Sequence, residues 1–141
     1  MAPLTTNIVS LNGVWTWFNG PRAIYDAAAD SLIWGDLRND GVPAVYAWQL
    51  ADRRYLHGTP RPTPLQVDDH DNPALLLLDT GEILCAYSQH NGAAYSARST
   101  QPHDVRAWTT PVHANPGFTD SYAWLWQAAD AEKTVYWMYR R

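Results

Sequence analysis

The residues best suited to chemistry lie in one short polar stretch. Residues 68–72 read DDHDN and place His70 among three carboxylates and an amide, and His90 follows twenty residues later. Two imidazoles brought together could supply a base, an acid or a neutralising charge near neutral pH. The alternative is structural: Asp69 and His70 cap a turn, and His90 is a solvated loop residue.

Other kinds of reactive site fit the sequence less well. The polar stretch could offer a metal ion four ligands: Asp68, Asp69, His70 and Asp71. It lacks the zinc spacings with two histidines or two cysteines, and it lacks an EF-hand pattern. No Gly-x-Ser-x-Gly elbow of a serine hydrolase occurs. We therefore expect neither a metal nor a cofactor, and we expect exposed positions for the remaining histidines, His57, His103 and His113.

An internal repeat of about fifty residues must position these side chains. Pro21 and Pro73 each introduce an apolar run, and they lie 52 residues apart. The matching turns Asp40-Gly41 and Asn91-Gly92 lie 51 residues apart, so the copies align almost without a gap. We expect the glycine of each turn to adopt a positive φ.

The repeated runs have the length and composition of β-strands. They are rich in β-branched and aromatic residues, and Gly, Pro, Asn and Asp separate them. The alanines at 27–29 are too few to nucleate a helix, so we expect a hairpin loop there. The expected strands are residues 22–26, 32–35, 44–48, 74–78, 83–86, 94–98, 122–126 and 134–139.

Short strands repeated at this interval predict an all-β fold, a β-propeller with antiparallel four-stranded blades. We expect one partial domain over 1–141, with blades at roughly 13–62 and 68–117 and an incomplete blade at 120–141. Closed propellers have about four to eight blades, and this chain supplies about two and a half. We therefore expect a fragment of a longer protein, or else several chains in one ring. An incomplete blade leaves an unpaired edge through which the chain could self-associate.

The repeat also predicts which candidates meet. Connections into first strands and hairpins after second strands can share one face of a propeller, so we expect His70 and His90 side by side. By its place in the repeat, Tyr122 falls near them, and so does Arg140. Such a group suits an acidic sugar, because an arginine can pair with its carboxylate while the other side chains move protons. The structural alternatives are a core tyrosine and a solvated arginine.

Composition excludes some partners. Fourteen acidic residues stand against ten basic ones, giving a net charge of −4, which argues against the basic face that nucleic-acid binding needs. No apolar run is long enough for a membrane span. Eight Trp and eight Tyr stand beside two Phe, and such rings suit half-buried strand positions or sugar-stacking surfaces.

The cysteine count and the N-terminus add two expectations. Cys85, the single cysteine, lies in an apolar run and is expected to be a small buried hydrophobe. The first residues show neither the basic nor the apolar region of a signal peptide. The compartment stays undefined, and a secreted parent that lacks its start is compatible with the sequence.

Three motifs resemble a known family. Residues 15–23 (WTWFNGPRA), 68–73 (DDHDNP) and 87–92 (YSQHNG) resemble BNR-repeat propeller proteins, and more narrowly the branch that contains ulvan lyases. Residues 99–108 (STQPHDVRAW) are similar to a degenerate Asp-box, the hairpin signature of those repeats. The resemblance covers nearly the whole chain. It implies a seven-bladed propeller of which this chain is the N-terminal portion.

The resemblance also implies an activity: β-elimination on a uronate-containing sulfated algal polysaccharide. In that reaction one group neutralises the uronate carboxylate, a base removes the C5 proton and an acid protonates the leaving O4. The family's catalytic histidines correspond to His70 and His90, and its proton-transferring tyrosine corresponds to Tyr122. For substrate binding, the resemblance points to Arg140, which would hold the carboxylate, and we add Asn72 and Trp17.

Two readings of other classes stay open. A carbohydrate-binding module without catalysis would use Trp and Tyr platforms, and could be an oligomeric propeller built from short chains. It would bind sugar without either histidine. A truncated, inactive piece of a propeller is the third reading, because fewer than three blades would leave the cleft without half its walls.

Overall fold

The computed structural model describes residues 13–14 and 23–140, with side chains from residue 23 onward. Trp17 therefore lies outside the described residues. Within them the regular elements are β-strands, joined by turns and loops, and the only helical element is η1, a 3-10 turn at Asp69–Asp71. No helix in this part of the chain has the length and apolar character that crossing a membrane requires.

The first sheet is built around β3 and its cross-strand neighbours. Strand β3 pairs antiparallel with β4 on one side, and with β1 and β2 at different points along the other side. Strand β5 pairs with the far edge of β4. The strands are β1 (Gly13–Val14), β2 (Ala23–Asp26), β3 (Ser31–Arg38), β4 (Pro43–Gln49) and β5 (Arg54–Gly58).

The second and third sheets follow in chain order. The second is a four-stranded antiparallel meander of β6 (Ala74–Leu77), β7 (Ile83–Ser88), β8 (Ala94–Arg98) and β9 (Val112–His113). The third is the hairpin of β10 (Ser121–Gln127) and β11 (Val135–Arg140). The blade limits 13–62, 68–117 and 120–141 stay predictions.

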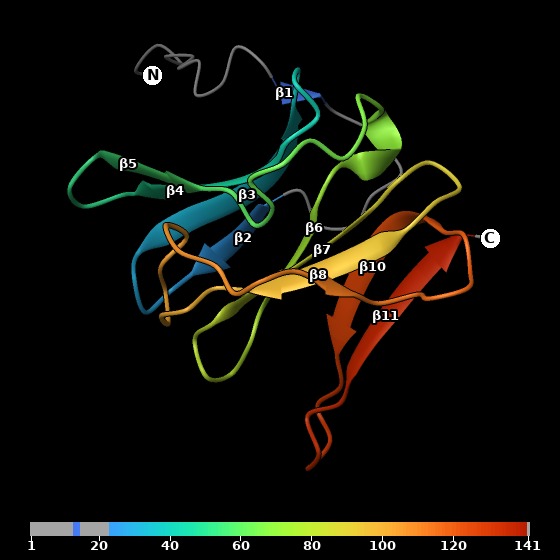
Figure 1. The fold of residues 1–141 in the computed structure, drawn as a ribbon. Coiled ribbons are helices and arrows are strands. Elements are labelled where there is room, and N and C mark those ends of the chain that lie inside the picture. Colours follow the sequence, from blue (N-terminus) through green and yellow to red (C-terminus); the bar gives the residue numbers. More distant parts are fainter. Residues whose placement is uncertain (1–12, 15–22, 141) are drawn as a thin grey trace, which may run out of the picture.

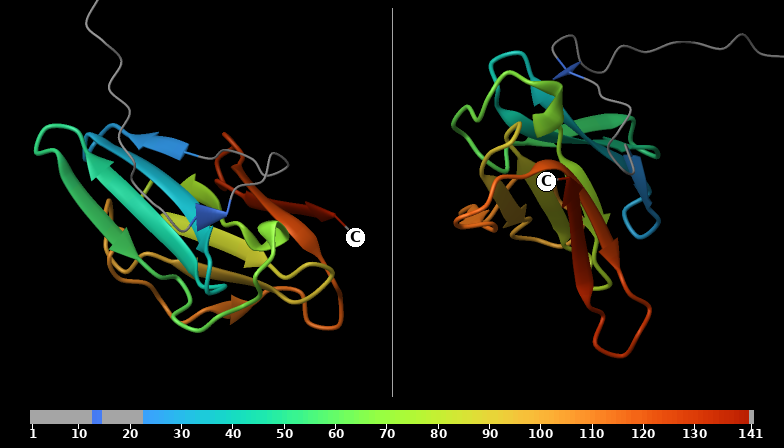
Figure 2. Two further views of the ribbon diagram at one scale, coloured as in Figure 1. Left: turned by 90° about the horizontal axis from the view of Figure 1, so that it is seen from above. Right: turned by 90° about the vertical axis from the view of Figure 1, so that its right-hand side faces the viewer.

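The sheets pack face to face in sequence order, and two apolar clusters hold them together (Figures 1 and 2). Between the first and second sheets lie Ile33, Val45, Ala47, Leu75, Ile83, Cys85, Tyr87 and Val105. Between the second and third lie Ala74, Ala86, Ala123 and Leu125. Each internal sheet face is apolar because alternate strand residues point to opposite sides. Successive sheets packed in this way form a partial β-propeller, as the sequence predicts.

The turns agree with the sequence in one hairpin and differ in the other. The alanine-rich loop joins β2 to β3, as expected, and Gly41 adopts a φ of 79°. In the second hairpin the expectation for Gly92 is wrong: Asn91 takes the left-handed conformation, with a φ of 50°. Asparagine tolerates this region better than most side chains. The strain is also offset, because the Asn91 N–H donates to Ser121 Oγ at 2.8 Å.

An ion pair clips the first sheet to the second. Asp26 ends β2 with its side chain fully buried, and one oxygen accepts from the backbone N–H groups of Ala28 and Ala29. The other oxygen lies 2.7 Å from Nδ1 of His103, in the connection between β8 and β9. His103 is exposed, as the sequence predicts, but its ring reaches back to a buried carboxylate.

Removing this clip should destabilise the fold. His103→Ala leaves the buried Asp26 carboxylate without one of its donors, and a hydrogen bond to a charged group contributes about 2 kcal/mol. We expect a loss of that size in the free energy of unfolding, measured by urea denaturation. His113→Ala is the matched control, since His113 is exposed and its ring stacks on Tyr95 at the surface. Equal losses in the two variants would contradict the role of the clip.

Candidate functional site

The turn η1 fixes His70 at the entrance to β6. Asp68 caps the turn: its side chain accepts the backbone N–H of His70 at 2.9 Å. The turn ends at Asn72, and Pro73 then leads into the strand. The expectation that Asp69 and His70 cap a turn is therefore wrong: both lie within the turn, and Asp68 caps it.

The hairpin between β7 and β8 carries His90 toward the same place. Its tip is tied to the third sheet by Asn91 and by paired backbone hydrogen bonds between Gly92 and Asp120. The backbone N–H of His90 donates to Gln66 Oε1 at 3.1 Å, in the connection that leads to η1. Contacts from both neighbouring segments therefore hold the hairpin.

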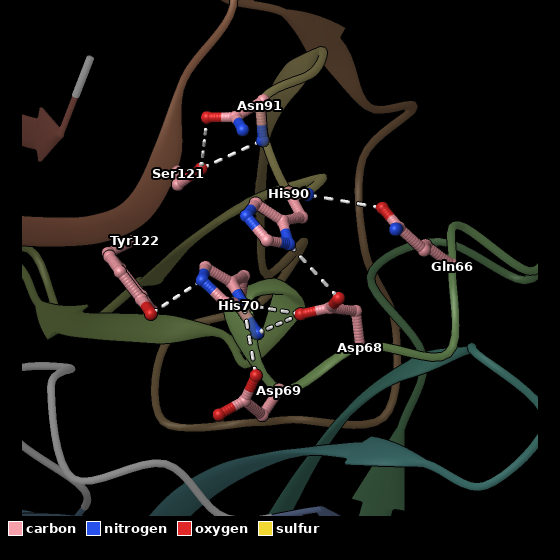
Figure 3. Close-up of polar contacts among 8 residues, drawn as sticks. All are labelled: Gln66, Asp68, Asp69, His70, His90, Asn91, Ser121 and Tyr122. Carbon is pink, nitrogen blue, oxygen red and sulfur yellow. Dashed lines mark hydrogen bonds and ion pairs between the residues drawn. The ribbon is translucent and has the colours of Figure 1, made fainter.

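A single carboxylate joins the two imidazoles (Figure 3). Asp68 Oδ1 contacts His70 Nδ1, and Asp68 Oδ2 lies 3.2 Å from His90 Nδ1. Asp69 also contacts His70 Nδ1, at 3.0 Å. Burial alone would raise the pKa of Asp68, but hydrogen bonds from the His70 backbone and from both imidazoles outweigh it and lower the pKa to about 2. Asp68 is therefore an anion that orients both rings.

The two rings form a stack that continues onto Tyr122. The His70 and His90 centroids are 3.7 Å apart with 7° between the ring planes, and the His70 and Tyr122 centroids are 4.3 Å apart. The Tyr122 hydroxyl lies 2.6 Å from His70 Nε2. The guanidinium carbon of Arg140 lies 4.7 Å from the Tyr122 ring centroid, close enough for a cation–π contact.

A β-bulge aims Tyr122 at the histidines. The pairing of β10 with β11 shifts between Ser121 and Trp124, and Tyr122 adopts a φ of 58° there. A bulky residue in this region is strained, and bulges re-aim side chains next to functional sites. Burial raises the pKa of Tyr122, while the charge of Arg140 acts in the opposite direction. The phenol is therefore protonated at neutral pH.

The structure brings together four of the six site residues expected from the sequence: His70, His90, Tyr122 and Arg140. Asn72 does not join them at the surface, since it is only 3% exposed. Trp17 cannot be placed. Their roles in catalysis and substrate binding stay predictions.

Sequence reasoning missed two contributions. It did not identify Asp68 as the shared partner of both histidines, although Asp68 lies in the polar stretch that contains His70. It also missed Gln66, which holds the His90 backbone and which no local pattern distinguishes from a solvated glutamine.

The stacked geometry argues against one metal ion bound by both histidines. Asp68, His70 and His90 offer ligand atoms within 4.8 Å of one another. However, an imidazole binds a metal along the in-plane lone pair at about 2.1 Å. Two nearly parallel rings 3.7 Å apart direct their lone pairs side by side, so these do not converge on one ion.

The hydrogen bonds also define where protons reside. An ionised carboxylate only accepts, so Asp68 receives Nδ1–H from each imidazole. Nε2 of His70 is then an acceptor, and the Tyr122 hydroxyl donates to it. This arrangement allows the Tyr122 proton to move onto His70, where Asp68 stabilises the resulting cation. The site can therefore pass a proton between a phenol and an imidazole beside a guanidinium.

Comparison with known proteins gives a likeness of fold. No family model matches the sequence, and no curated protein matches it. Among solved structures, the chain is similar to a PL25 polysaccharide lyase, an ulvan lyase, bound to -[GlcA(1-4)Rha3S]-, with a TM-score of 0.72 and 17% identity over 92% of this chain. A second structure of a PL25 ulvan lyase gives a TM-score of 0.70 with 18% identity, also over 92% of this chain. The chain spans 34% of the length of each.

Proposed function

We propose that the chain belongs to a polysaccharide lyase of the ulvan lyase type, of which it forms a part. The observation that carries the proposal is the stack of His90, His70 and Tyr122 on one shared carboxylate, with Arg140 beside it. The likeness to ulvan lyase structures supports an acidic polysaccharide as substrate. The BNR-like motifs in the sequence fit the same assignment.

The proposed reaction is β-elimination at a uronate. Arg140 pairs with the carboxylate, which acidifies the adjacent C5–H. The Tyr122 oxygen accepts the C5 proton while its own proton moves to His70 Nε2. The electrons of the C5–H bond form the C4–C5 double bond as the C4–O4 bond breaks. Tyr122 then protonates O4 and recovers its proton from His70, so the site returns to its starting state.

The test is the mass of the purified chain in solution, followed by an assay on the same sample. With ulvan as substrate, lyase activity raises the ultraviolet absorbance of the unsaturated uronate product. We expect that rise from a folded assembly or from the longer protein, and we expect its loss in His70→Ala and in His90→Ala. His57→Ala, an exposed histidine on β5, is the matched control. Full activity in both site variants would refute the lyase assignment.

Self-association is part of this proposal, because the third sheet leaves an apolar face uncovered. Trp124 and Trp126 of β10 are 46% and 55% exposed, and the cross-strand neighbours Met138 and Tyr136 are 51% and 47% exposed. Within the described residues, β11 pairs only with β10. For the chain by itself, we propose that a second copy packs on this face, and the solution mass tests it: a strict monomer would contradict this part.

The same exposed rings favour a second candidate, a carbohydrate-binding module without catalysis. Trp126 stacks on Tyr136 with centroids 5.4 Å apart, and both rings are about half exposed. Aromatic rings of this kind can stack on sugars. The two candidates differ in the wild-type result: a binding module would bind ulvan without forming product, and its binding, measured by calorimetry, would persist in the His70→Ala, His90→Ala double variant.

A further inference from the structure

One acid beneath the site takes no part in the reaction proposed above. Asp71 is the last residue of η1, and its side chain is fully buried. Among the described residues, neither carboxyl oxygen has a hydrogen-bond partner. The His90 backbone N–H lies near this carboxyl but donates to Gln66 Oε1.

An ionised carboxylate in this position would be very unfavourable. Burying a charge without a partner costs far more than burying the neutral acid, so such a group keeps its proton. Burial raises the pKa of Asp71 to about 8; the negative charges of Asp68 and Asp69 add to the increase, and the nearby His90 backbone N–H opposes it. Two independent features, the isolation of the carboxyl and the neighbouring anions, thus favour the same protonation state.

We propose that Asp71 is a positioning residue, whose neutral carboxyl packs beneath the histidine pair so that the partly buried Asp68 supplies the negative charge orienting both imidazoles. The proposal concerns the resting site and does not depend on which substrate the protein takes. A second anion beneath the pair would compete with Asp68 for the imidazole protons.

Ionisation of Asp71 at alkaline pH should therefore be felt at the histidines. Strands β7 and β10 pack against η1, and their segments carry the other titratable groups of this region. Including those of η1 and its cap, the groups around Asp71 are Asp68, Asp69, His70, Tyr87, His90 and Tyr122, with Arg140 beyond the tyrosine.

The first test is an NMR titration of the wild-type chain, which needs neither substrate nor activity. We expect the side-chain carboxyl carbon of Asp71 to titrate with a midpoint near pH 8. The imidazole nitrogens of His90 should show a step with the same midpoint. An Asp71 midpoint near pH 4, or no matching step at His90, would overturn the proposal, whatever the outcome of the lyase assay.

The variant Asp71→Asn separates positioning from simple packing. It keeps the shape of the neutral acid but cannot ionise, so we expect the histidine tautomers of the wild type without the step near pH 8. Asp52→Asn, at an exposed position in the β4–β5 turn, is the matched control and should keep the step. If Asp71→Asn also keeps the step, another group causes it and the proposal fails.

Stability gives a second measurement with a definite sign. The unfolded chain loses the Asp71 proton near the ordinary pKa of 3.8, whereas the folded chain holds it to about pH 8. The folded state therefore binds more protons between these values, and its stability falls as pH rises through that window. We expect the difference between the Tm of Asp71→Asn and the Tm of the wild type to shift in favour of Asp71→Asn as the pH rises from 5 to 9. A constant difference would contradict a buried neutral acid.

Discussion

Replacing Asp68 by asparagine should lower lyase turnover by about a thousandfold, on the scale seen when a carboxylate that orients a catalytic histidine is removed. Asp68 accepts from Nδ1 of His70 and of His90, so the loss affects both rings together. An asparagine side chain of nearly the same shape presents an N–H₂ group in place of one oxygen. That group repels one Nδ1–H and permits the other tautomer, in which Nε2 carries the proton. Where His70 takes that tautomer, it can no longer accept the Tyr122 proton.

The tautomers can be measured independently of turnover. In the wild type, the imidazole nitrogen resonances should show both neutral histidines protonated at Nδ1, and Asp68→Asn should convert at least one of them. Asp69→Asn is the matched control, because the Asp69 side chain bonds to His70 alone among the described residues, at 3.0 Å, and is more exposed than Asp68. We expect turnover of Asp69→Asn to fall by less than about tenfold, because a single contact to one ring orients it only weakly. Equal losses in the two variants would show that total charge matters and orientation does not.

Much of the fold could be predicted because its signal is local. The interval between Pro21 and Pro73 reports a repeat, and the apolar runs between turn residues report strands. The strands β2, β3, β4, β6, β7, β8, β10 and β11 lie at the expected places. The short strands β1, β5 and β9 could not be identified, since edge strands gain their hydrogen bonds from a neighbour and need no apolar alternation of their own.

The sequence predicts most of the residues of the candidate site, but it does not predict which side chains bond to one another. Position in the repeat indicated His70, His90, Tyr122 and Arg140, because each falls at one end of a repeated strand. Which carboxylate of the run 68–71 serves which imidazole depends on the direction that η1 gives each side chain, and three adjacent acids look alike in sequence. The turn exposes Asp69, directs Asp68 to both rings and buries Asp71.

Burial separates Asn72 from the residues with which the sequence grouped it. Asn72 directly follows η1, in the segment that leads into β6, and it is only 3% exposed. Proximity along the chain to His70 therefore did not imply a shared surface. The turn likewise buries Asp71 below the histidines. Burial of individual residues in this segment could therefore not be predicted from their order in the sequence.

Removing the Tyr122 hydroxyl should cause the second large loss of activity. Tyr122→Phe keeps the ring that stacks on His70 and lies under Arg140, so substrate binding and stability should change little. In the proposed reaction, it removes the group that takes the C5 proton while passing one to His70 Nε2. Loss of a positioned proton-transfer group costs about 10² to 10⁴ in rate, so kcat should fall by that factor with KM nearly unchanged.

Two comparisons make the result decisive. Tyr136→Phe removes a hydroxyl from a half-exposed tyrosine on the same hairpin and should leave kcat and the Tm unchanged. Tyr122→Phe should likewise keep the wild-type Tm, because phenylalanine meets the same positive φ that tyrosine already tolerates. A rise in KM with kcat intact would place Tyr122 among the binding residues and leave His90 as the base. A fall in kcat alone would make the bulge at Tyr122 a strained backbone feature retained for proton transfer, which is the outcome the 2.6 Å contact with His70 favours.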